Sequence, residues 1–382
     1  MSDLTPNRFS MLLPTVPGPA AVAPGKPDPL SAIQTLSADD MAHMEALYDN
    51  PASRPKGETT HIDAIDAHFR WVPGYTNLLI AKPGRGKSEL DRLFKLLRAV
   101  YAAKKSLNFV PEDMPKHAWY DSIIHALTGQ NPDPESENPL PKIYYKRAME
   151  WVREYFYVVV CPKGMGKTPE HILDIFEAGR AKLGIEHFTL DPWNKADHSG
   201  LVAAGGFQPY LVKNLGLITD WTQENQVYTT LIAHPKGGDR RRPGEAFAVP
   251  DAEDASGGPT FNDMMHSVSA LDRPNMHITR NDPAVGFYQH KIKSHRRMGA
   301  KPGSIGEGSE NPDVLITYDW RKNRYTFNGV DPLHTRLAQS LYAPELTQLA
   351  DAQLPPSDRY DPNAGLNNSA FEEEYRPMGL RL

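Results

Sequence analysis

The chain has 382 residues, 40% of them hydrophobic, and a formal net charge of −5. That length allows one large domain or two modest ones, and the mildly acidic charge means that any nucleic-acid contact must come from a local basic patch. The only cysteine, Cys161, excludes a disulfide framework and a cysteine-rich zinc site. No stretch approaches the roughly 18 apolar residues that a membrane span needs, so we expect no membrane association.

The two ends of the chain differ in composition from its middle. Both are rich in proline and poor in periodicity, which is typical of flexible segments, and the C-terminal end carries the acidic, aromatic stretch FEEEYRP. We expect a flexible arm over 1–38, a lead-in segment over 39–70, one α/β domain over 71–335 and a flexible acidic tail over 336–382.

Strand-like and helix-like segments alternate through the middle. Candidate strands are 75–81, 106–110, 156–160, 186–190, 228–234, 266–272, 286–292, 313–320 and 324–329. Candidate helices are 88–103, around 117–127, 169–182 and 209–223, and the first repeats leucine and aromatic residues at helical spacing. Alternation followed by a run of strands predicts an α/β fold whose sheet is mainly parallel, with an antiparallel extension.

Two segments have the outline of a phosphate-binding Walker A loop between a strand and a helix. LLIAKPGRGKSEL covers 78–90 and VVVCPKGMGKTPEHI covers 158–172, and both lack the first glycine of the pattern, with Ala81 and Cys161 in its place. Such a loop needs its Ser or Thr in the first turn of the helix, where the hydroxyl binds Mg²⁺ beside the phosphates.

That requirement separates the two loops. Ser88 runs into its helix without a break, whereas Thr168 precedes Pro169, and a residue before proline is pushed out of the helical region. We therefore predict that Thr168 caps a helix with Pro169 at its first position, and that the first loop binds nucleotide. The predicted nucleotide-binding residues are Ala81, Lys82, Pro83, Gly84, Arg85, Gly86, Lys87, Ser88 and Glu89.

Three further residues lie where strands end. Glu112 follows the second strand and could deprotonate the attacking water, while Asp191 follows the strand at 186–190 and could hold Mg²⁺. His234 ends the strand at 228–234 and could contact the γ-phosphate. Taken alone, each also fits an ordinary structural role, but together they stand in the chain order that phosphoryl transfer requires.

Basic residues gather in two later segments. Lys236, Arg240, Arg241 and Arg242 lie in a long loop at 234–259 and suit a nucleic-acid backbone, although a solvated charge run has the same pattern. Lys293, Arg296 and Arg297 precede a glycine-containing turn and could reach a neighbouring subunit's γ-phosphate, or bind nucleic acid, or merely end a strand.

Taken in order, these segments resemble the ATPase domain of ring helicases of the DnaB/Twinkle type, including phage-like members, which have a RecA-like P-loop fold. The resemblance covers about 57–330 and includes FVPEDMP, FTLDPWNKADH, LIAHPKGG and KIKSHRRMGAKPG. It implies that Lys87 and Ser88 bind ATP and Mg²⁺, that Glu112 is the catalytic base and that Asp191 is the Walker B acid. It further implies that His234 senses the γ-phosphate and that the loop after it contacts single-stranded DNA. Which of Lys293, Arg296 and Arg297 acts in trans stays open.

The resemblance also carries expectations about assembly and setting. It implies a hexameric ATP hydrolase that unwinds DNA in replication, with residues 39–56 packed on a neighbouring subunit. It implies a cytoplasmic protein of a bacterial or phage-infected cell, with the tail docking a primase, polymerase or single-strand-binding protein. The alternatives are a RecA-like recombination or DNA-loading ATPase without unwinding, a nucleotide-binding assembly protein with weak hydrolysis, suggested by Ala81, and more distantly a small-molecule kinase.

Overall fold

The computed structural model describes residues 31, 33–113, 115–162, 164–236, 249–255, 257–302 and 312–352. The chain divides into two compact units, Met1–Pro55 and Lys56–Leu382. The described part of the first unit forms α1 (Ala38–Asp49) and the short 3-10 helix η2 (Pro51–Ser53). Ser37 and Asp40 cap the start of α1 reciprocally, and none of the residues of α1 is buried.

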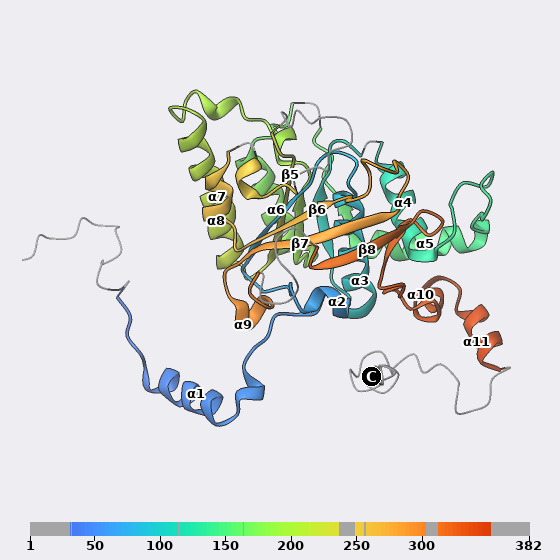
Figure 1. Cartoon of the computed structure of the whole chain (residues 1–382), viewed down its shortest axis with the longest axis horizontal. Coiled ribbons are helices and arrows are strands. Elements are labelled where there is room, and N and C mark those ends of the chain that lie inside the picture. Colours follow the sequence, from blue (N-terminus) through green and yellow to red (C-terminus); the bar gives the residue numbers. More distant parts are fainter. Residues whose placement is uncertain are drawn as a thin grey trace, which may run out of the picture. The chain divides into compact units, whose positions relative to one another are not determined.

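A nine-stranded sheet organises the described part of the second unit (Figure 1). Its spatial order is β3-β2-β4-β5-β1-β6-β7-β8-β9; the pairings from β3 to β6 are parallel and those from β6 to β9 antiparallel. The strands are β1 (Thr76–Ile80), β2 (Ser106–Phe109), β3 (Phe156–Val158), β4 (His187–Leu190), β5 (Tyr228–Ala233), β6 (Ser267–Asp272), β7 (Ala284–Ile292), β8 (Val314–Asp319) and β9 (Arg324–Phe327). All nine predicted strands and the mixed character of the sheet are therefore confirmed.

The predicted helices correspond to four of the observed ones, α3, α4, α6 and α7. The helices of the second unit are α2 (Asp63–Asp66), α3 (Lys87–Ala102), α4 (Lys116–Thr128), α5 (Lys142–Tyr155), α6 (Pro169–Leu183), α7 (Phe207–Glu224), α8 (Pro259–Met264), α9 (His295–Met298), α10 (Thr335–Tyr342) and α11 (Pro344–Ala352). Short 3-10 turns are η3 (Trp193–Lys195), η4 (Ser199–Leu201) and η5 (Ala252–Asp254). No helix in the described part of the chain is long and apolar enough to cross a membrane.

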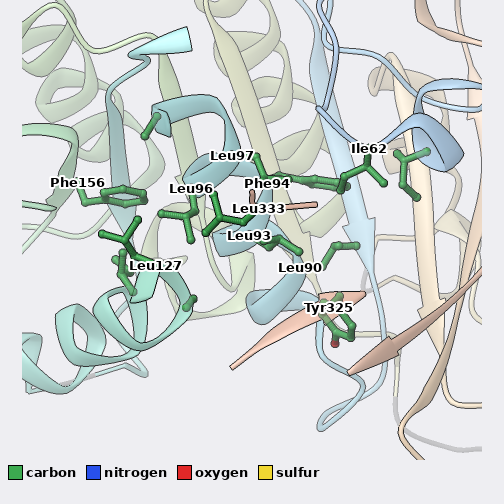
Figure 2. Packing of buried hydrophobic residues seen from close by; sticks show 14 of the residues in the cluster. Ile62, Leu90, Leu93, Phe94, Leu96, Leu97, Leu127, Phe156, Tyr325 and Leu333 are labelled. Atoms are coloured by element: carbon green, nitrogen blue, oxygen red, sulfur yellow. The ribbon is translucent and has the colours of Figure 1, made fainter. Parts of the chain in front are cut away.

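The sheet separates two hydrophobic clusters, because successive side chains of a strand point to opposite faces. In β1, Leu79 joins one cluster while Leu78 and Ile80 join the other. Helices α3, α4, α5 and α10 cover the Leu79 face, and α6, α7 and α8 cover the opposite face. Figure 2 shows the buried row that α3 contributes to the first cluster, with Tyr325 at the Leu90 end. Each such buried leucine contributes roughly 1.5–3 kcal/mol, so the row fixes α3 firmly against the sheet.

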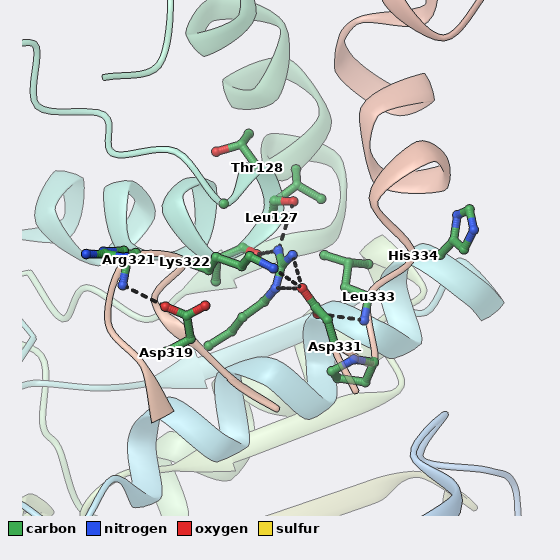
Figure 3. A network of polar contacts seen from close by, with 12 residues as sticks. Leu127, Thr128, Asp319, Arg321, Lys322, Asp331, Leu333 and His334 are labelled. Carbon is green, nitrogen blue, oxygen red and sulfur yellow. Dashed lines mark hydrogen bonds and ion pairs between the residues drawn. The ribbon is translucent and has the colours of Figure 1, made fainter. Parts of the chain in front are cut away.

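The end of β9 is tied to α4 by a polar network (Figure 3). Arg324 is buried and donates to the carboxylate of Asp331 at 2.6 Å and to the backbone oxygen of Ala126, also at 2.6 Å. Lys322 and the backbone N–H of Leu333 donate to the same Asp331. Although burial disfavours its charge, the hydrogen bond from Arg324 keeps the pKa of Asp331 below its usual value. The network therefore holds β9, which borders the site described below, in a fixed place.

The C-terminal tail expected from residue 336 differs from the structure in its first part. Helices α10 and α11 occupy this stretch as far as Ala352, and Ala338 and Tyr342 of α10 are buried. The ring of Tyr342 meets Tyr144 of α5 edge-on, with 6.3 Å between the centroids. The packed residues repeat at helical spacing over only two turns, which is too short a pattern to stand out between prolines. Residues 353–382 lie outside the described part of the chain.

Candidate active site

The loop 81–86 joins the central strand β1 to α3 at the edge of the sheet where the parallel strands end. Gly84 and Gly86 have positive φ angles of +72° and +87°, and Gly86 is the residue from which α3 starts. The first backbone N–H groups of a helix lack helical partners and attract anions, so this loop can hold phosphate groups. A Cβ on Gly86 would lie 1.7 Å from the hydroxyl of Tyr325, which donates to the carbonyl of Gly86 at 3.1 Å. Position 86 therefore requires glycine on two counts.

Ala81, which replaces the first glycine of the motif, sits in the loop without backbone strain. It is fully buried in the cluster on the Leu79 face and is absent from the set of described non-glycine residues with positive φ. The conformational freedom of glycine is thus not needed at this position. The substitution consequently gives no structural ground for expecting a defective loop.

The side chain of Arg85 anchors the loop from inside. Its Nε lies 3.2 Å from Oδ1 of Asp272, at the end of β6, and its guanidinium also contacts Met276. The side chains of Arg85 and Asp272 are only 2% and 3% exposed. The backbone N–H of Arg85 is therefore the group of this residue that can reach a phosphate.

Lys87 and Ser88 stand in the first turn of α3, beside several carboxylates. Burial lowers the pKa of Lys87, and the negative charges of Asp191 and Glu89 oppose that effect. Ser88 Oγ donates to Oδ2 of Asp191 at 2.6 Å, although Asp191 follows β4, two strands away from β1 in the sheet. Burial raises the pKa of Asp191 to about 6. A hydroxyl and a carboxylate at this distance are hard oxygen ligands of the kind that Mg²⁺ prefers.

Glu112 lies just after β2, at the same edge of the sheet. Its Oε1 is 3.1 Å from Nζ of Lys195, the last residue of η3, and the two side chains are 48% and 51% exposed. Lys195 was not among the predicted site residues. Its place four residues after Asp191, in the same strand-end loop, is the signal that could have found it.

His234 follows β5 and lies beside the phosphate loop, since Ile80 of β1 is in register with Ala233. Burial, followed by the charge of Lys87, lowers the pKa of His234, so the imidazole is neutral at pH 7. Its Nδ1 is buried and has no hydrogen-bond partner among the described residues. A neutral imidazole with one nitrogen unsatisfied can hydrogen-bond a phosphate oxygen placed between β1 and β5.

Comparisons with known proteins agree with this geometry. No protein-family model matches the chain. It is 22% identical over 319 residues to the Twinkle homolog protein, chloroplastic/mitochondrial, of Arabidopsis thaliana, and the match covers 82% of this chain but only 42% of that relative. The solved ATPase domain of a DnaB-like helicase superposes with a TM-score of 0.54 at 11% identity, over 77% of this chain and 99% of that domain. The resemblance to DnaB/Twinkle-type helicase domains is confirmed. The RadB recombinase also superposes, with a TM-score of 0.42 and 12% identity over 70% of this chain and 97% of the other.

The second glycine-rich loop of this RecA-like fold is a helix cap. It follows β3, the edge strand of the sheet, and Thr168 Oγ1 accepts from the backbone N–H of His171 at 3.4 Å. Pro169 is the first residue of α6. The prediction made from the Thr168–Pro169 pair is confirmed.

A buried polar cluster supports the RecA-like site from behind. The ammonium of Lys95, in α3, donates to Asp91, to Thr189 of β4 and to Asn108 Oδ1 of β2, the last at 2.6 Å. Burial lowers the pKa of Lys95, and the charge of Asp91 opposes the shift. The cluster ties the helix of the phosphate loop to the two strands that present Glu112 and Asp191. Sequence reasoning missed it, because a lysine flanked by apolar helix residues usually extends to solvent.

The predicted basic residues lie at both edges of the sheet. Lys236 is exposed and borders a pocket of about 410 Å³ that α7 and α8 also line. The residues around this pocket, called the α7–α8 pocket below, are Phe207, Gln208, Lys236, Gly257, Gly258 and Pro259. Arg240, Arg241 and Arg242 lie outside the described residues.

Arg296 and Arg297, in α9, lie at the edge of the sheet opposite to the phosphate loop. The guanidinium of Arg297 covers the ring of Tyr75 at 5.7 Å, and Tyr75 precedes β1 whereas the loop follows it. A five-residue strand spans roughly 16 Å, so these arginines are far from the phosphate loop of their own chain. Arg296 is exposed at the surface.

Proposed function

We propose that this chain is a Mg-ATP-dependent motor that assembles as a hexameric ring, moves along single-stranded DNA and separates the duplex. The observation that carries the proposal is the 2.6 Å contact between Ser88 and Asp191, beside the buried Lys87. A hydroxyl, a carboxylate and a cation gathered under a glycine loop form a site for a metal-bound triphosphate.

The residues present fit Mg-ATP. The glycine loop leaves open space above Gly84, where a Cβ would meet no atom within 4 Å, and so admits phosphate oxygens. Among the described residues no group of three or more histidine, cysteine or acidic side chains could hold a metal by itself. Mg²⁺ is typically held by one or two protein oxygens together with phosphate and water, which suits the pair Ser88 and Asp191. When bound, Mg-ATP supplies the γ-phosphoryl group and the metal charge that stabilises its transfer.

The remaining groups then have separate tasks in hydrolysis. Lys87 and the N–H groups at the start of α3 hold the phosphates, and Glu112 accepts the proton of the attacking water. His234, neutral and with Nδ1 free to bond, orients a γ-phosphate oxygen. Each task follows from the position of the residue at one edge of the parallel sheet.

The α7–α8 pocket is the proposed contact for single-stranded DNA. Phe207 is 38% exposed there and offers an aromatic face, while Lys236 offers a cation for the DNA backbone. Stacking on an aromatic ring and pairing with phosphates are the two contacts by which proteins bind single strands without sequence preference. Arg240, Arg241 and Arg242 are proposed to extend this surface.

Assembly completes the proposed site. Because Arg296 lies at the edge opposite to its own phosphate loop, we assign it rather than Arg297, which covers Tyr75, to a neighbouring subunit's ATP. In the first unit, α1 exposes Met41, Met44 and Tyr48 at helical spacing, which suits packing on another subunit.

The proposal is tested by native mass measurement and by unwinding of a forked duplex, with Glu112→Gln as the inactive reference. We expect six-fold assemblies with ATP and single-stranded DNA, ATP-dependent unwinding by the wild type, and nucleotide binding without turnover by E112Q. DNA-stimulated ATPase without unwinding would instead indicate a recombination or loading factor. Binding without turnover in the wild type would indicate an assembly protein, and a persistent monomer would contradict the motor.

A further inference from the structure

The candidate base Glu112 is already engaged by a cation that the proposed mechanism does not use. Its Oε1 is 3.1 Å from Nζ of Lys195, and both side chains are about half exposed. A carboxylate that accepts from an ammonium group is a weaker proton acceptor than a free one. The ammonium of Lys195 therefore competes with the attacking water for Glu112.

Lys195 is held by a rigid piece of structure. The adjacent Trp193 is buried, and its ring lies edge-on to Phe261 of α8 with 6.1 Å between centroids. His198 bonds the backbone oxygen of Trp193 at 3.0 Å through Nε2 and the hydroxyl of Tyr210, in α7, at 3.0 Å through Nδ1. η3 is thus clamped between α7 and α8.

The same two helices line the α7–α8 pocket. Phe207 stands at the start of α7, and Pro259 at the start of α8. A ligand that shifts these helix ends moves the piece that carries Lys195. The contacts therefore run from the proposed DNA surface through Trp193 and His198 to Glu112.

We propose that Lys195 is a positioning residue that latches Glu112 while the α7–α8 pocket is empty, and releases it when single-stranded DNA binds there. The proposal rests on the proposed function, since it needs Glu112 as the base and DNA as the ligand. Exposed ion pairs contribute little, so the latch is a weak brake of about 2- to 5-fold on turnover and not an absolute block.

The test measures steady-state ATPase of the full chain, kcat and KM for Mg-ATP, with and without a single-stranded oligothymidylate. Lys195→Ala is compared with Lys195→Arg, which keeps the charge, and with Lys213→Ala. Lys213 is a matched control because it forms an ion pair of 3.0 Å with Glu170, is similarly exposed and lies outside the proposed site. We expect K195A to raise the DNA-free kcat about 2- to 5-fold with KM nearly unchanged.

The DNA-saturated kcat of K195A should match the wild type, so the stimulation by DNA falls by the same factor. K195R should return the DNA-free rate toward the wild type, and K213A should not differ from it. Loss of stability cannot produce this result, because a damaged fold lowers turnover in both states.

An unchanged or lowered DNA-free rate in K195A, or the same increase in K195R, overturns the latch. If E112Q is inactive in that experiment, the proposed function stands and only the latch fails. If E112Q retains turnover, or if the wild type hydrolyses no ATP, the proposed function fails first and the latch fails with it.

Discussion

Arg85 lies inside the phosphate loop with its Nε 3.2 Å from Oδ1 of Asp272, and both side chains are almost fully buried. Removing one partner of a buried ion pair leaves the other charge in a poorly solvating environment. Asp272→Ala should therefore lower the free energy of unfolding by about 3–5 kcal/mol. Urea denaturation measures the effect, with Arg180→Ala in the exposed Arg180–Glu177 pair as control, where we expect at most about 0.5 kcal/mol. Equal losses in the two variants would show that Arg85 does not depend on Asp272.

Gly84 and Gly86 differ in what surrounds them. Gly84→Ala meets no neighbouring atom and adds only the strain of its positive φ, about 1–2 kcal/mol. Gly86→Ala has similar backbone strain and also places its Cβ 1.7 Å from the hydroxyl of Tyr325. Binding of a fluorescent ATP analogue and urea denaturation should both show a larger loss for G86A than for G84A. A ranking in the opposite order would mean that Tyr325 moves aside without cost.

Ala81 is buried and unstrained, so restoring the glycine of the common motif should bring no benefit. Ala81→Gly removes a buried methyl group and increases the freedom of the unfolded chain, which costs roughly 0.5–1 kcal/mol or more. We expect a lower unfolding free energy and an unchanged or lower kcat. A clear rise in kcat would support the alternative in which Ala81 marks weak hydrolysis.

The trans assignment of Arg296 predicts complementation between two defective subunits. Arg296→Ala keeps its own Glu112, and Glu112→Gln keeps Arg296, so each alone should lose most ATPase activity. A mixture that exchanges subunits should regain part of it, because some sites combine an intact base with an intact arginine. No recovery in mixed rings, verified by native mass measurement, would place the arginine in another role. Arg297→Ala is the comparison, and should lower stability through its lost contact with Tyr75.

His266 predicts a loss of stability in mild acid. Burial, together with the charges of Lys293 and Lys291, lowers its pKa to about 4, and its Nδ1 accepts from the backbone N–H of Thr76 at 3.2 Å. Because the pKa in the unfolded chain is higher, near 6.5, the unfolded state takes up a proton first as the pH falls. Stability present above pH 6.5 should therefore be lost as the pH falls toward 4. His266→Asn, which does not titrate, should lose less between pH 7 and pH 5 in urea denaturation, and parallel curves would contradict this.

The strands were predictable because parallel sheets bury both faces, which leaves short apolar runs between turns. Helix α5 was not, since its sequence is mostly charged and aromatic and only Ala148 and Val152 are buried. The strand-end residues Asp191 and His234 could be placed at one edge because parallel strands end together.

The pairings within the site could not be derived in that way. Contacts such as Glu112–Lys195 depend on the spatial order of the strands and on how the intervening loops fold back. Neither is encoded in periodicity. The arrangement of Arg85 was also hidden, because a loop arginine next to glycines is more readily assigned to the ligand than to the interior.

Tyr325 belongs to the last strand of the sheet and meets Gly86 across 239 residues of sequence. A chain emerging from the ribosome therefore completes its glycine loop long before the side chain that braces it exists. ATP affinity should appear late in synthesis, once β9 has been added and paired with β8. Nucleotide capture by this protein would thus report that translation and folding have both reached the far end of the sheet.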